Sequence, residues 1–268
     1  MESFTTSDGL RLAYAVDDFT DPWRPADTLV LSHAAMGSSN RFYAWVPLLA
    51  RHFRVVRMDM RGHGASAAPN AEQNAFERLT RDLIELLDHL GVESAHLAGS
   101  SAGGIISMGV AIRHPRRVKT LASYAATPGM KNSKKIDRSR WMANIRGKGM
   151  AGFLRDTIAD RLPLDQVAPA FVDWFIDDSA RTDVEAFLRF VPMMEQIDLV
   201  PDLGKIQCPV LVVVPGADPI LSVDEYQLIR QQIPHCEFVV YDGMPHNITD
   251  TVPERCAGEL REFLARHA

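Results

Sequence analysis

The chain has 268 residues, of which 46% are hydrophobic and 24% charged, and its formal net charge is −5. This length suits one large α/β domain or two small ones. The net negative charge does not favour binding to nucleic acid or to an anionic membrane. Three scattered cysteines, no signal-peptide pattern and no apolar stretch of about 18 residues predict a cytoplasmic protein without a disulfide framework or a membrane span.

Short apolar runs that alternate with helical patterns predict an α/β fold with a doubly wound, mostly parallel sheet. The N-terminal stretch 4–16 reads as a hairpin that turns at Ser7-Asp8-Gly9. Six further strands are expected at residues 28–32, 54–60, 95–99, 118–124, 210–214 and 237–241. Most of these runs are continuous rather than alternating, which is typical of strands that are covered on both faces. Four helices are expected at residues 76–90, 102–114, 224–233 and 253–265.

The stretch from residue 127 to residue 206 interrupts this alternation. It contains no convincing strand and reads as helices punctuated by glycine and proline. We therefore predict a core made of residues 1–126 and 207–268, with residues 127–206 as a helical cap over the edge of the sheet. The alternative is that these helices simply enlarge the core.

A candidate nucleophile follows the strand expected at 95–99. Ser101 is the central residue of a Gly-x-Ser-x-Gly motif that lies between a strand and an apolar helix. The chain reverses so sharply in such a turn that the positions two residues before and after the serine must be tiny, and Gly99 and Gly103 satisfy this requirement. Ser100 is the alternative nucleophile, but its equivalent neighbours are Ala98 and Ala102.

A serine hydroxyl needs a base, and the base needs an acid that orients it. Asp218 directly follows the strand expected at 210–214, and His246 lies in the loop after the strand expected at 237–241. In this architecture the expected order along the chain is serine, acid, histidine, and the carboxyl ends of parallel strands meet at one edge of the sheet. Asp218 and His246 are therefore the predicted partners of Ser101. Asp224 and Asp242 remain alternative acids, whereas His235 precedes its strand and lies at the wrong end.

An oxyanion hole requires two backbone N–H groups near the nucleophile. Ala102 follows Ser101 at the start of a helix, where N–H groups are free. The second donor is expected in the loop 33–39, at Ala35.

With these motifs, the sequence resembles the α/β-hydrolase superfamily over nearly its whole length. His33-Ala34-Ala35-Met36 is similar to the family's His-Gly-x-x oxyanion loop, with Ala34 in place of the usual glycine. The segment 59–66, Asp-Met-Arg-Gly-His-Gly-Ala-Ser, resembles a turn that is structural in the family, so His63 is not the expected base. Within the superfamily the chain looks most like capped lactonases and esterases, notably 3-oxoadipate enol-lactonases, on the basis of residues 53–66 and 86–91.

The predicted activity is hydrolysis of a small carboxylic ester or lactone through an acyl-enzyme. Cleavage of carbon–carbon bonds in dienone acids by the same triad is one alternative, and a small-ligand receptor without catalysis is another. No residue pattern suggests a metal or a cofactor, and the protein is a possible homo-oligomer.

The substrate pocket is expected between the sheet edge and the cap, with Met36, Trp141, Arg146 and Met193 as candidate contacts. Residues 131–150 contain one acidic residue, Asp137, and seven basic residues. The basic residues are Lys131, Lys134, Lys135, Arg138, Arg140, Arg146 and Lys148. One of these bases could grip a substrate carboxylate. The alternative is a solvated helix face, since the later part of the expected cap is acidic, with six aspartates between residues 156 and 178.

Overall fold

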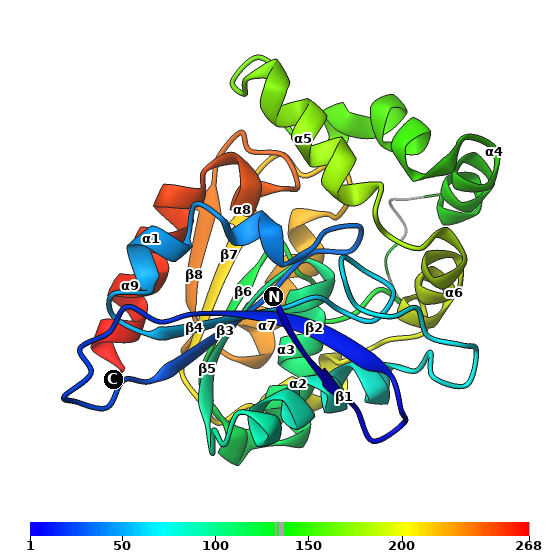
Figure 1. Ribbon diagram of the computed structural model, residues 1–268. Helices are drawn as coiled ribbons and strands as arrows, with labels where there is room; N and C mark the ends of the chain where they lie inside the picture. The colour runs from blue at the N-terminus through cyan, green and yellow to red at the C-terminus, as the bar shows by residue number, and fades with distance from the viewer. Residues whose placement is uncertain (132, 134–136, 268) are drawn as a thin grey trace.

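The computed structural model describes residues 1–131, 133 and 137–267 (Figure 1). In this part of the chain eight strands form one sheet in the order β1-β2-β4-β3-β5-β6-β7-β8. Strand β2 pairs antiparallel with β1 and β4, and all other neighbours are parallel. The strands are β1 (Glu2–Thr5), β2 (Arg11–Asp17), β3 (Thr28–Ser32), β4 (Arg54–Met58), β5 (Ala95–Ser100), β6 (Val118–Tyr124), β7 (Val210–Pro215) and β8 (Glu237–Tyr241). The predicted fold class and the N-terminal hairpin are confirmed.

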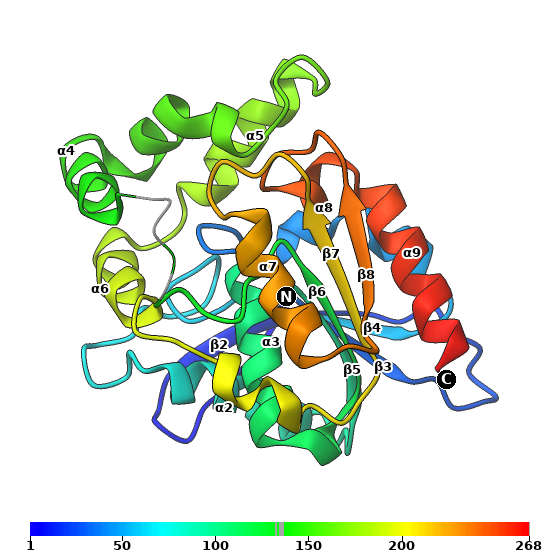
Figure 2. The same ribbon diagram turned by 180° about the vertical axis from the view of Figure 1, so that it is seen from behind.

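Helices cover both faces of the sheet, which explains why its central strands are apolar throughout. In β7, Val210, Val212 and Val214 belong to one hydrophobic core, and Leu211 and Val213 to the other. Figures 1 and 2 show the two layers from opposite sides. The first core lies under α2 (Phe76–His89), α3 (Ala102–Arg113) and α7 (Val223–Gln232). The second lies under α1 (Val46–Leu49), α8 (Ile248–Thr251) and α9 (Pro253–Arg266).

Three longer helices lie between β6 and β7 in the chain. They are α4 (Arg138–Thr157), α5 (Pro169–Ser179) and α6 (Val184–Met194), and α4 is broken at Gly149, where φ is 69° and ψ is 174°. In both ribbon views α4 and α5 lie beyond the end of the sheet toward which β7 and β8 point. None of the described helices is both long and apolar enough to cross a membrane.

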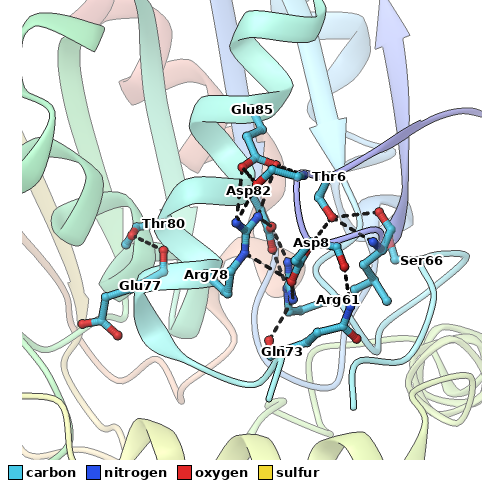
Figure 3. A network of polar contacts seen from close by, with 12 residues as sticks. Thr6, Asp8, Arg61, Ser66, Gln73, Glu77, Arg78, Thr80, Asp82 and Glu85 are labelled. Carbon is cyan, nitrogen blue, oxygen red and sulfur yellow. Dashed lines mark hydrogen bonds and ion pairs between the residues drawn. The ribbon is translucent and has the colours of Figure 1, made fainter. Parts of the chain in front are cut away.

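A network of buried and partly buried charges connects the N-terminal hairpin to the segment after β4 and to α2 (Figure 3). Arg61 donates two hydrogen bonds to Asp82, at 2.7 and 2.5 Å, and a third to Asp8 at 3.0 Å. Arg78 also donates to Asp82, at 3.0 Å. Arg61 is therefore bound within the scaffold, as expected for a turn that is structural.

Candidate active site

Ser101 lies in a tight turn between β5 and α3, with the unusual backbone angles φ 50° and ψ −116°. The flanking glycines make this turn possible. A Cβ on Gly99 would lie 2.3 Å from the carbonyl oxygen of Gly103, and a Cβ on Gly103 would lie 2.2 Å from that of Ser32. Real Cβ atoms essentially never approach so closely, so both positions require glycine. The motif is thus explained by backbone packing against backbone.

The ring of His246 lies between Ser101 and Asp218. Its Nε2 is 3.0 Å from the Ser101 Oγ, and its Nδ1 is 2.7 Å from the Asp218 Oδ2. Asp218 and His246 are both buried. An ionised carboxylate only accepts hydrogen bonds, so Nδ1 carries the ring proton and Nε2 accepts from the serine hydroxyl. The three residues that the sequence analysis selected are therefore within hydrogen-bonding distance, in an arrangement that can remove a proton from Ser101.

Asp218 is held as a carboxylate by several donors. The backbone N–H groups of Ile220 and Leu221 donate to its Oδ1 at 2.7 and 3.2 Å, and the buried hydroxyl of Tyr226 donates to its Oδ2. Burial opposes ionisation, but His246 and these hydrogen bonds outweigh it and lower the pKa of Asp218 below its usual value. Sequence reasoning missed Tyr226, which lies on α7 and carries no motif of its own.

The alternative residues lie elsewhere. The Ser100 hydroxyl is 3.0 Å from the Oγ1 of Thr249, and no hydrogen bond joins it to His246 among the described residues. Asp224, Asp242 and His235 are exposed. The geometry therefore favours Ser101, Asp218 and His246 over each of their competitors.

The loop after β3 brings Ala35 to the same pocket as Ser101 and Ala102. His33 fixes the start of this loop, since its Nε2 accepts from the Met60 N–H at 2.9 Å and its Nδ1 lies 2.8 Å from the Ala34 carbonyl oxygen. Complete burial lowers the pKa of His33, so its ring is neutral, as this pair of bonds requires. The oxyanion role of Ala35 and Ala102 stays a prediction.

The pocket is lined mainly by apolar side chains from the insertion and from the sheet edge. Met36 and Trp141 contribute to its lining, as the sequence predicted. Arg146 and Met193 are not among its described lining residues, which include Arg161 and Met194 instead. Arg146 is exposed on α4, and Met194 rather than its neighbour Met193 is the buried residue on α6. Consecutive helical residues point about 100° apart, so a shift of one position changes the face.

The bases of residues 131–150 whose side chains the structure describes do not line this pocket. Lys134 and Lys135 lie outside the described residues, as does the side chain of Arg138. Lys131, Arg140 and Lys148 are exposed, and none of the three lines the pocket. Among the residues with assigned positions, no group of His, Cys, Asp and Glu could hold a metal ion.

Comparison with known proteins shows which family the sequence matches. The sequence model of the alpha/beta hydrolase fold matches residues 27–167, just over half of the chain. The chain is 27% identical over 246 residues to 3-oxoadipate enol-lactonase 2 of Acinetobacter baylyi, covering 89% of this chain and 87% of the relative.

Solved structures agree with the sequence match. A hydrolase from Pseudomonas aeruginosa PA01 is 27% identical and has a TM-score of 0.86, with 98% of this chain and 97% of the other covered. The enol-lactonase from Burkholderia xenovorans LB400 has a TM-score of 0.90 at 24% identity, with 98% and 100% covered. At that identity the second likeness shows the fold alone.

Proposed function

The chain belongs to the α/β-hydrolase family, and we propose that it is a serine hydrolase that cleaves a carboxylic ester or lactone through an acyl-enzyme. One observation carries the proposal: the imidazole of His246 bridges the Ser101 hydroxyl and the Asp218 carboxylate, at 3.0 and 2.7 Å. The similarity to an enol-lactonase supports the same class of reaction.

In the first half of the reaction, the Ser101 Oγ attacks the carbonyl carbon while its proton passes to the His246 Nε2. Asp218 accepts the hydrogen bond from Nδ1 and stabilises the imidazolium that results. The negative oxygen of the tetrahedral intermediate is held by the N–H groups of Ala35 and Ala102. His246 then returns its proton to the departing alkoxide, and an ester of Ser101 remains.

In the second half, water attacks the acyl carbon of this ester and gives a proton to the same Nε2. Collapse of the second tetrahedral intermediate breaks the bond to the Ser101 Oγ, which takes the proton back from His246. A carboxylic acid leaves, and the enzyme returns to its starting state.

We assign residues 127–206 to a cap. Its apolar side chains, Trp141 among them, surround the substrate together with Met36.

The test compares the wild-type enzyme with Ser101→Ala on a panel of a 4-nitrophenyl ester, an aliphatic lactone and a dienone acid. The variant should lose roughly 10³- to 10⁶-fold in kcat/KM, as in other triads. Ser100→Ala is the matched control and should keep most of the activity, since its hydroxyl contacts Thr249.

Three results would contradict the proposal: full activity in Ser101→Ala, turnover of the dienone acid alone, or no turnover of any substrate. A fluorophosphonate that labels Ser101 would show a reactive serine, but turnover is needed to establish the enzyme.

A further inference from the structure

Among the side chains that the structure describes, three arginines are almost completely buried, and two of them are neutralised by carboxylates. Arg41, 6% exposed, pairs with Asp178 at 2.7 Å and with Asp250 at 3.1 Å. Arg61, 2% exposed, pairs with Asp82 and Asp8, as described above. These pairs are what burial of a guanidinium normally requires, because an uncompensated charge away from water is strongly destabilising.

The third buried arginine has no such partner. Arg161 is 3% exposed, and no carboxylate of the described residues lies within 4.0 Å of its guanidinium. The residues outside the described part have no acidic side chain in the sequence. Its Nη1 donates to the carbonyl oxygen and hydroxyl of Thr157, both at 2.9 Å, whereas its buried Nη2 has no hydrogen-bond partner among the described residues.

Arg161 lines the same pocket as Ser101 and His246. Its guanidinium carbon lies 5.2 Å from the ring centre of Trp141 and 5.3 Å from that of Phe153, so two aromatic rings fix its position. Its own carbonyl oxygen accepts a hydrogen bond from the N–H of Asn247, the residue after His246, at 3.1 Å. Arg161 is thus part of the wall of the site, and its backbone is hydrogen-bonded to the loop that carries His246.

Burial lowers the pKa of Arg161 to about 10, which still leaves the group charged at neutral pH. Asp160 and Asp218 favour the charge through space, but neither forms an ion pair with it. An unused donor of a charged group in a mainly apolar pocket is satisfied when an anionic acceptor enters the pocket.

We propose that Arg161 binds a carboxylate of the substrate, so that the preferred substrates are esters or lactones bearing a second, anionic end. A carboxylate matches the planar guanidinium and supplies both the charge and the acceptor that Nη2 lacks. This inference rests on the proposed hydrolase function and adds to it the class of substrate.

The experiment uses two methyl esters that differ only at the far end. Monomethyl glutarate carries a carboxylate, and methyl 5-amino-5-oxopentanoate carries a neutral amide of the same shape. The ratio of their kcat/KM values is measured for the wild-type enzyme, Arg161→Gln, Arg161→Lys and Arg155→Gln. Because the ratio is taken within one protein, a loss of folded enzyme cancels from it.

The kcat/KM of the wild-type enzyme should be roughly 10- to 100-fold higher for the ester with the carboxylate. This ratio corresponds to the free energy that a hydrogen bond to a charged group contributes. Arg161→Gln should remove most of this preference through KM, and Arg161→Lys should restore part of it. Arg155→Gln changes an exposed arginine of the same insertion and should leave the ratio unchanged. A ratio near one in the wild-type enzyme, or the same ratio in Arg161→Gln, would overturn the inference.

A second measurement needs only the wild-type protein and no turnover. Glutarate should slow the labelling of Ser101 by a fluorophosphonate at concentrations where the neutral diamide of glutarate does not. Equal protection by both compounds would contradict the role of Arg161. Failure of the proposed function is a different result: Ser101 is not labelled, or neither of the two methyl esters is hydrolysed.

Discussion

Gly103→Ala tests whether the turn at Ser101 depends on close backbone packing. A Cβ at this position would lie 2.2 Å from the Ser32 carbonyl oxygen and 2.6 Å from that of His33. Both atoms belong to the main chain and cannot rotate away, so α3 and the end of β3 must separate by about 1 Å. A displacement of about 1 Å in an active site can cost about 10²-fold in rate, equivalent to about 2.7 kcal/mol of activation free energy. The separation would widen the space between Ala35 and Ala102, so the loss should fall on kcat.

The assay measures kcat and KM with a 4-nitrophenyl ester, together with thermal unfolding of each variant. Overpacking should also lower the free energy of unfolding by about 1–3 kcal/mol. Gly147→Ala is the matched control, because a Cβ on this helical glycine meets nothing within 4 Å. It should leave the kinetics unchanged and stabilise the protein slightly. If Gly103→Ala kept its kcat and its unfolding temperature, the reasoning about the turn would be wrong.

Two further predictions concern buried charges. Tyr226→Phe removes a hydrogen bond to Asp218 and should raise the pKa of that carboxyl toward its usual value. A carboxyl with a lowered pKa stabilises the fold above its unfolded pKa, and this stabilisation disappears as the pH falls through the folded pKa. The free energy of unfolding of the variant, measured in urea at pH 7, should therefore be lower by about 1.5–3 kcal/mol. A difference from the wild type that stayed the same at acid pH would contradict this account. Arg41→Met leaves Asp178 and Asp250 as buried unpaired charges and should cost about 3–5 kcal/mol by the same method. Arg24→Met, at an exposed ion pair, should have far less effect, and equal losses in the two variants would refute the distinction.

The parts of the site that sequence reasoning found are those with a local signal. Ser101 is marked by glycines on both sides, and Asp218 and His246 each follow an apolar strand. The end of a parallel strand is a fixed place in an α/β sheet, so chain order was sufficient to predict that the three would meet. The structure brings them to hydrogen-bonding distance in that order.

The residues that were missed depend on how separate segments pack. Arg161 follows a short 3-10 helix, and nothing in its neighbours distinguishes it from the other arginines of the insertion. Its position became evident only from its burial and from its lack of a carboxylate. Arg146 was a reasonable candidate by charge, but the break at Gly149 and the face that α4 exposes cannot be read from its composition. Tyr226 needed the placement of α7 beside Asp218.

The left-handed backbone of Ser101 has a consequence for attempts to make this protein more robust. A side chain at φ 50° costs on the order of 1–3 kcal/mol, which a glycine at the same place would largely avoid. A library screened for heat tolerance alone would therefore enrich glycine at position 101 and discard the reactive hydroxyl. Engineering for durability has to select for turnover at the same time, because here the two properties favour different residues.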